Sequence, residues 1–211
     1  MTDATLRVLG RASSINVRKV LWLCAELPRP CVHEAWGSGT TSTLPPGFEA
    51  LNPGRKVPVI VDQGFVLWES NTICRYLAGR AGRVDLLPVE PASRARVEQW
   101  MDWMATDLDA AWRYAFQSIV RQSPGHADPA AVAASVASWT RHMQILERQL
   151  DATGAWVAGA DFSLADIVIG VATHRWLKTP IERPALPRVQ AYYERLLQRP
   201  AFMRHVGSGT P

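Results

Sequence analysis

The first part of the chain alternates short apolar runs with helical segments, and this alternation ends near residue 90. The pattern predicts a strand at 6–8, a helix from about 16, a strand near 32–36, strands around 58 and 65, and a helix through 76–77. The sequence Asp62-Gln63-Gly64 is a turn between the last two strands. This order predicts a βαβ unit followed by a ββα unit.

Beyond residue 90 the apolar residues recur three and four positions apart, as on one face of a helix. The first such set is Val97, Trp100, Met101, Met104, Leu108, Ala111 and Trp112. Asp128 followed by Pro129 predicts the start of another helix. Ser163 and Asp166 have the spacing of a capping box, which predicts a further helix start with a structural role.

The change in pattern divides the chain into two predicted domains. We expect an α/β domain over residues 1–82, a linker over 83–90 and an all-α domain over 91–211. An apolar fraction of 47% in 211 residues is ample for a packed core.

One residue interrupts the strand pattern of the first domain. Pro58 opens the apolar run 57–61, although proline donates no ladder hydrogen bond and is tolerated only at a strand end, an edge or a bulge. The next strand leads directly into Glu69-Ser70-Asn71, three polar residues typical of a helix start. Pro58 and the polar helix start at 69–71 are therefore both candidates for a functional site.

Charge and cysteine content exclude several classes of protein. The net charge of +4 comes from basic residues scattered among carboxylates, which argues against nucleic acid as a partner. The longest apolar stretches are too short to span a membrane, and the N-terminus has no apolar signal core, so we expect a cytoplasmic protein. The cysteines, Cys24, Cys31 and Cys74, have no metal-ligand spacing, and no metal site is predicted.

The start of the first helix carries three polar residues, Ser13, Ser14 and Asn16. A helix N-terminus presents unpaired N–H groups and the positive end of the helix dipole. One interpretation is a serine that only caps the helix. The alternative is a hydroxyl that also donates a hydrogen bond to a bound anion.

Four motifs together resemble a known family. "SSINVRKVLWLCAEL", "NPGRKVPVI", "LWESNTICRYL" and "FSLADIVIG" occur in this order over essentially the whole chain. The chain thereby resembles the cytosolic glutathione transferases. The spacing of Ser14, Asn16 and Lys19 is most similar to the bacterial serine-type members, close to the theta and nu classes. The resemblance implies a thioredoxin-like N-terminal domain and an all-helical C-terminal domain.

The same resemblance implies a glutathione site. It implies that Pro58 is cis, so that the backbone of Val57 pairs with the cysteine portion of glutathione. It also implies that Ser70 and its amide bind the γ-glutamyl carboxylate and that Glu69 binds the γ-glutamyl ammonium. Lys56 is a further candidate for a glutathione carboxylate, although an exposed, solvated lysine is the alternative.

The loop before Pro58 departs from the family pattern N-P-x-G-x-V-P. Gly54 lies one place early, and Arg55 stands where the glycine is expected. We therefore expect this loop to turn differently and consider Arg55 as an additional contact to glutathione or its co-substrate.

The resemblance assigns the nucleophile to the glutathione thiolate. We expect Ser14 to donate a hydrogen bond to it, Asn16 to hold the sulfur or the loop, and Ser13 to be the alternative donor. Aromatic residues are dense in 103–116, and Trp112 and Tyr114 are candidates for the pocket of an apolar co-substrate, with a core role as the alternative.

The predicted activity is conjugation of glutathione to small, electrophilic, apolar molecules as a step in detoxification. The alternatives are a glutathione-dependent peroxidase or thiol-disulfide reductase, and a non-catalytic protein that binds ligands or protein partners on the same fold. The resemblance also implies a homodimer. It does not identify the electrophile or decide between conjugation and reduction.

Overall fold

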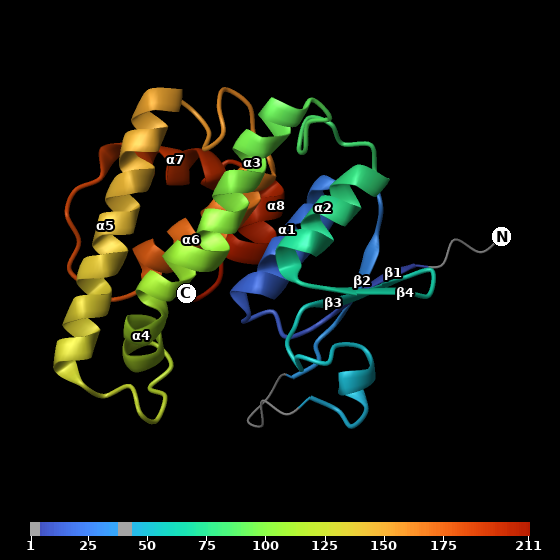
Figure 1. The fold of residues 1–211 in the computed structure, drawn as a ribbon, viewed down its shortest axis with the longest axis horizontal. Helices are drawn as coiled ribbons and strands as arrows, with labels where there is room; N and C mark the ends of the chain where they lie inside the picture. The colour runs from blue at the N-terminus through green and yellow to red at the C-terminus, as the bar shows by residue number, and fades with distance from the viewer. Residues whose placement is uncertain (1–4, 38–43) are drawn as a thin grey trace. The chain divides into compact units, whose positions relative to one another are not determined.

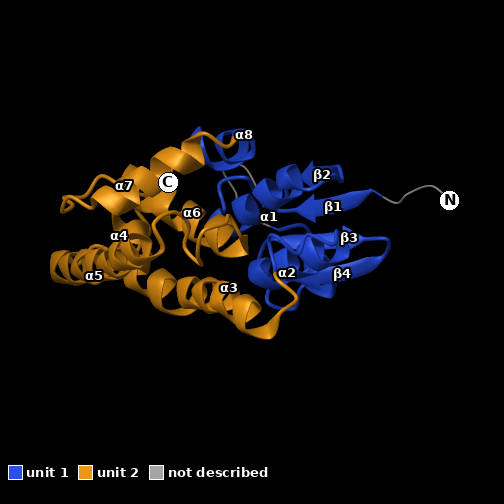
Figure 2. Cartoon of the chain, turned by 90° about the horizontal axis from the view of Figure 1, so that it is seen from above, with its two compact units in different colours: residues 1–87, 200–209 blue, residues 88–199, 210–211 orange. Residues whose placement is uncertain are grey.

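The computed structural model describes residues 5–37 and 44–211. Their contacts divide the chain into two compact units (Figure 2). The sheet unit extends to Leu87 and includes Pro200–Gly209, and the helical unit comprises Pro88–Arg199 with the last two residues. The boundary near residue 87 falls inside the predicted linker.

The sheet unit contains four strands in the order β2-β1-β3-β4 (Figure 1). Their bounds are Leu6–Leu9 for β1, Cys31–Glu34 for β2, Val59–Asp62 for β3 and Phe65–Trp68 for β4. Strands β1 and β2 are parallel, whereas β3 runs antiparallel to both β1 and β4. This is the sheet that a βαβ unit followed by a ββα unit produces.

Helices α1 (Ile15–Glu26) and α2 (Ser70–Arg80) lie side by side against this sheet (Figure 1). The first turns of α1 already bury Val17 and Val20 completely, which is the apolar face that the sequence predicts. A short 3-10 helix, η1 (Phe48–Ala50), contributes Phe48 to a separate apolar cluster with Leu9 and Val59. The cluster includes Val57 at its margin.

Gly10, directly after β1, is packed too tightly for any side chain. Its φ is +144°, and a Cβ there would lie 2.7 Å from Val17 Cγ2 and 2.8 Å from Val57 Cβ. The absence of a side chain thus lets α1 and the segment before β3 approach each other closely.

The helical unit is formed by five helices and one π-helical turn. They are α3 (Pro91–Trp103), η2 (Met104–Leu108), α4 (Asp109–Ile119), α5 (Pro129–Thr153), α6 (Leu164–Lys178) and α7 (Pro187–Leu197). Trp112, Trp139 and Trp176 from three of these helices are fully buried in the core, where the Trp139 ring contacts that of Trp112 at a tilt and that of Trp176 edge to face. Within the described part of the chain, no helix combines the length and apolarity needed to cross a membrane.

Helix α6 begins at the predicted capping box. The Asp166 carboxylate is completely buried and accepts hydrogen bonds from the Ser163 amide at 2.9 Å, the Ser163 hydroxyl at 3.2 Å and the Val157 amide at 2.9 Å. Burial raises the pKa of this carboxyl to about 6, against the lowering effect of these hydrogen bonds. The box therefore ties the helix start to the preceding loop and serves the fold.

The last residues pack with the sheet unit. The sequence prediction placed all of 91–211 in the helical domain, but α8 (Pro200–Phe202) and the π-helical turn η3 (Met203–Gly207) contact α1. The rings of Phe202 and Trp22 meet edge to face, 4.9 Å apart, and both side chains are buried. This long-range aromatic contact has no local signature in the sequence.

Candidate functional site

Ser14 occupies the N-cap position of α1, as the capping interpretation expects, but its side chain does not cap the helix. Its backbone is extended, with φ −80° and ψ 124°, and its side chain makes no cap hydrogen bond. The side chain is half-buried, whereas that of the neighbouring Ser13 is exposed. The hydroxyl of Ser14 is thus placed at a helix N-terminus without being used to close it.

The start of α2 has a strained backbone. Glu69 is exposed and has φ +71°, a left-handed value that non-glycine residues adopt rarely and at a cost. Its side chain makes no cap hydrogen bond, although it occupies the N-cap position. The next residue, Ser70, is buried, with 7% of its surface exposed. Strain at an exposed carboxylate beside a buried hydroxyl is typical of a binding site.

A hydrogen bond joins the starts of the two helices. The Ser70 hydroxyl donates to Asn16 Oδ1 at 3.3 Å, across 54 positions of the sequence. Lys19, one turn further along α1, reaches the same hydroxyl, with its Nζ 3.4 Å from Ser70 Oγ. The structure therefore brings Asn16 and Ser70 together, and it adds Lys19, which the sequence motif contains but to which we had assigned no role.

The segment before β3 contains the predicted cis bond between Val57 and Pro58. The ladder of β3 begins at Val59, so Val57 lies outside the paired strand. Asn52 holds the loop: its Nδ2 donates to the Lys56 carbonyl and its Oδ1 accepts from the Gly54 amide, each at 2.8 Å. Asn52 is only 3% exposed, and the signal that would have identified it is the N-P dipeptide of the motif.

The altered glycine position has a definite consequence. Arg55, and not Gly54, has a positive φ, at +50°. The arginine therefore takes the conformation that favours glycine, while its guanidinium forms an exposed ion pair with Glu49 at 3.1 Å. The side chain of Lys56 is exposed as well.

The two aromatic candidates of the helical unit differ. Trp112 is 1% exposed, with its ring 5.6 Å from that of Trp139, so it belongs to the core of the unit as the alternative interpretation held. Tyr114 is half-buried, and its hydroxyl accepts a hydrogen bond from the Asp128 amide at 3.3 Å. The spacing along α4 decides this difference, because neighbours two apart point to different sides of a helix.

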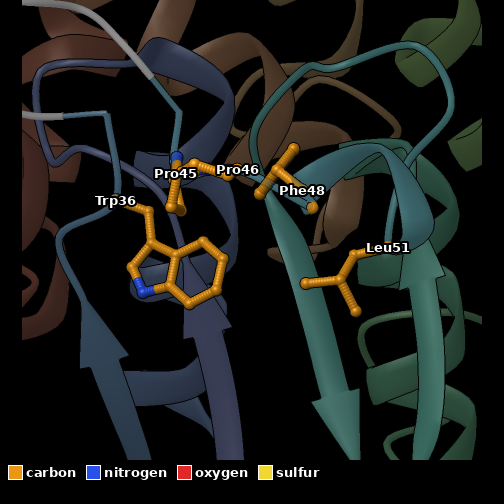
Figure 3. Close-up of a pocket in the computed structure, with 6 residues that line it drawn as sticks. Trp36, Pro45, Pro46, Phe48 and Leu51 are labelled. Carbon is orange, nitrogen blue, oxygen red and sulfur yellow. The ribbon is translucent and has the colours of Figure 1, made fainter.

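The sheet unit also contains an apolar cavity that the sequence did not predict (Figure 3). It has a volume of about 380 Å³ and is lined by Trp36, Pro45, Pro46, Gly47, Phe48 and Leu51. Phe48 belongs to the apolar cluster that also contacts Val57. Apolar packing thus connects this cavity with the segment that carries the cis bond.

Comparisons with known proteins show which proteins this chain resembles. The family model described as "Glutathione S-transferase, N-terminal domain" matches residues 13–80, and "Glutathione S-transferase, C-terminal domain" matches residues 129–195. Glutathione S-transferase GstB of Escherichia coli is 34% identical over 199 residues, which cover 93% of this chain and 95% of the relative. Glutathione S-transferase 3 of Zea mays is also 34% identical, over 97% of this chain and 95% of its own length.

A solved structure extends the similarity to three dimensions. The theta class glutathione S-transferase of Xanthomonas axonopodis pv. citri, with glutathione bound, has a TM-score of 0.87 and 35% identity, covering 98% of this chain and 99% of its own. Sequence, domain order and fold agree over nearly the whole length. The chain therefore belongs to the glutathione S-transferase family.

Proposed function

We propose that this protein transfers the glutathione thiolate to small electrophilic molecules. The observation that carries the proposal is the hydrogen bond between Ser70 and Asn16, because it joins the starts of α1 and α2. One helix start then provides a hydroxyl for the thiol, and the other provides groups for the γ-glutamyl end. The relationship to glutathione S-transferases supports this assignment of the ligand.

Glutathione is bound through its charged ends. Ser70 and the amides at the start of α2 receive the γ-glutamyl carboxylate, and Glu69 receives the ammonium. The Val57 backbone, next to Pro58, pairs with the cysteine portion, and the exposed side chain of Lys56 is available to a further carboxylate.

Ser14 then stabilises the charged form of sulfur. A free thiol with a pKa of about 8.5 is only about 3% ionised at neutral pH, and lowering the pKa by about two units requires about 2.7 kcal/mol. A hydrogen bond to a charged group contributes about 1.5 to 3 kcal/mol, and a helix N-terminus about 0.3 to 1 kcal/mol. Ser14 and the start of α1 are together sufficient, with Asn16 orienting the site.

The thiolate attacks the electrophilic carbon and forms a sulfur–carbon bond. The electron pair of the broken bond leaves with a displaced group or, in an addition, moves onto the substrate, which then takes a proton from solvent. We assign Tyr114 to the electrophile pocket, whereas Trp112 belongs to the core of the helical unit. A homodimer, a cytoplasmic location and a role in detoxification follow as proposals from the family alone.

Titration calorimetry with glutathione tests binding, and ultraviolet absorbance of the bound thiolate tests activation. Glu69→Ala weakens binding, whereas Ser14→Ala retains binding but loses the thiolate signal at neutral pH. Ser13→Ala is the matched control, because it removes the neighbouring hydroxyl and leaves the signal unchanged. Absence of glutathione binding to the wild type overturns the proposal.

Comparing activated aryl halides and epoxides with hydroperoxides and disulfides as co-substrates separates transfer from reduction. In the alternative reductases a cysteine stands at the start of the first helix, where this chain has Ser13 and Ser14. Turnover of only the hydroperoxides or disulfides would favour the alternative.

A further inference from the structure

A buried lysine of α1 contacts the first two residues of α2. Lys19 is 2% exposed, and its Nζ is 3.4 Å from Ser70 Oγ and 3.3 Å from Asn71 Oδ1. Burying an ammonium group is unfavourable unless its surroundings compensate. Packing alone would therefore favour an apolar side chain at this position. Both of these oxygens belong to uncharged groups, so each contact is a hydrogen bond from the ammonium group to a neutral acceptor.

The charge of Lys19 acts on its surroundings. Burial raises the pKa of the neighbouring Cys74 thiol to about 12, and Lys19 is the first of the groups that oppose this rise. In the protein interior the effective dielectric is well below that of water, so a charge acts over several ångströms without direct contact. An anion at the start of α2 would experience the same attraction.

The hydrogen bonds give Lys19 a second route to that anion. Lys19 donates to the oxygen of Ser70, and Ser70 donates its own proton to Asn16. A hydroxyl whose oxygen accepts a hydrogen bond from a cation becomes a stronger donor, because the bonds in a chain polarise one another. If the Ser70 proton turns from Asn16 to a ligand carboxylate, Lys19 strengthens the new bond.

We propose that Lys19 is a positioning residue that, through Ser70, selects ligands bearing the α-carboxylate of the γ-glutamyl group. The inference rests on the proposed glutathione site and adds to it the residue that supplies the positive charge. The contacts of Lys19 are with Ser70 and Asn71 at the start of α2, where the γ-glutamyl end is proposed to bind, so we expect its effect on recognition of the ligand.

The test compares glutathione with an analogue that lacks only this carboxylate, 4-aminobutyryl-cysteinyl-glycine. Calorimetry measures both affinities for the wild type and for Lys19→Met, which keeps a long unbranched side chain but removes the charge. The wild type is expected to prefer glutathione at least about 10-fold, and Lys19→Met is expected to reduce this preference to less than about 3-fold. Affinity for the analogue itself should change little.

Three controls separate the possible causes. Lys178→Met makes the same substitution at an exposed lysine of α6 and should retain the full preference. The analogue that lacks only the ammonium, glutaryl-cysteinyl-glycine, should lose affinity in Lys19→Met by the same factor as glutathione. Lys19→Arg keeps the charge and should retain part of the preference if it folds, as judged by circular dichroism.

The outcomes are distinguishable. If Lys19→Met weakens glutathione and the carboxylate-free analogue equally, or leaves the preference unchanged, Lys19 has only a structural role and the inference is overturned. If the wild type binds neither ligand, the proposed function itself fails. If Lys19→Met does not fold, the charge-retaining Lys19→Arg decides, because loss of the preference in that folded variant also contradicts the inference.

Discussion

Helices α2 and α6 each begin with a serine close to a carboxylate, yet the hydrogen bonding at the two starts differs. At α6 the buried Asp166 accepts hydrogen bonds from Ser163 and from the preceding loop, so the helix start is closed by its own side chains. At α2 the exposed Glu69 is strained and makes no cap hydrogen bond. A closed helix start stabilises the fold, whereas an open one can bind an anion.

Asp166→Ala is expected to have the largest effect on stability. The change leaves the buried Val157 and Ser163 amides without their acceptor and removes the cap, which should reduce the free energy of unfolding by about 3 kcal/mol or more. Chemical denaturation measures the loss, and Ser163→Ala should cost about 1 kcal/mol. Glutathione affinity of the folded fraction should remain unchanged. A stability loss under about 1 kcal/mol would mean that the hydrogen bonds of Asp166 do not stabilise the start of α6.

The ionisation of Asp166 should also make stability depend on pH. Its pKa is about 6 in the folded protein and 3.8 ordinarily, so the folded state binds its proton more tightly. The stabilisation that comes from this raised pKa is therefore complete below about pH 3.8 and is lost as pH rises through about 6. Relative to Asp166→Asn, which does not titrate, the wild type should lose about 2 kcal/mol between about pH 4.5 and about pH 7.5.

Denaturation of both proteins across this pH range checks the sign as well as the size. If the stability of the wild type relative to Asp166→Asn stays constant or increases as pH rises, the pKa of Asp166 is not raised in the folded protein.

At the open helix start, stability and binding should change in opposite directions. Glu69→Gly relieves the left-handed backbone and should raise the free energy of unfolding by up to about 1 kcal/mol, while removing the carboxylate should weaken glutathione about 10-fold. Glu69→Gln is the matched variant, because it removes the charge and keeps the strain. It should weaken binding without a gain in stability. Equal stability of the two variants would show that the strain at Glu69 is negligible.

Arg55 is expected to give the smallest effect. Arg55→Gly should stabilise the protein by less than about 1 kcal/mol, because relief of the left-handed backbone exceeds the loss of an exposed ion pair. Glu49→Ala removes the same ion pair and leaves the backbone unchanged, so it should be neutral or slightly destabilising. Thermal unfolding distinguishes the two. A clear loss of stability in Arg55→Gly would assign the larger contribution to the ion pair.

The sequence was most informative where the determining interaction is local. The capping box of α6 depends on residues three apart, and the four strands and helices α1 and α2 follow from periodicity and turn residues. The cis bond before Pro58 was inferred from the family motif, and the structure contains it. Ser14, Asn16, Glu69 and Ser70 were likewise placed at helix starts by their motifs, whereas their roles toward glutathione remain predictions.

Contacts between distant parts of the chain were decided only by the tertiary structure. The approach of Lys19 and Asn16 to Ser70 depends on how the sheet sets α1 beside α2, and the packing of Phe202 on Trp22 depends on the return of the chain end. Trp112 and Tyr114 looked equivalent in the sequence, but one fills the core and the other reaches the surface. Residue patterns encode helices and strands because those interactions span a few positions, whereas a site forms from side chains that only the folded chain brings together.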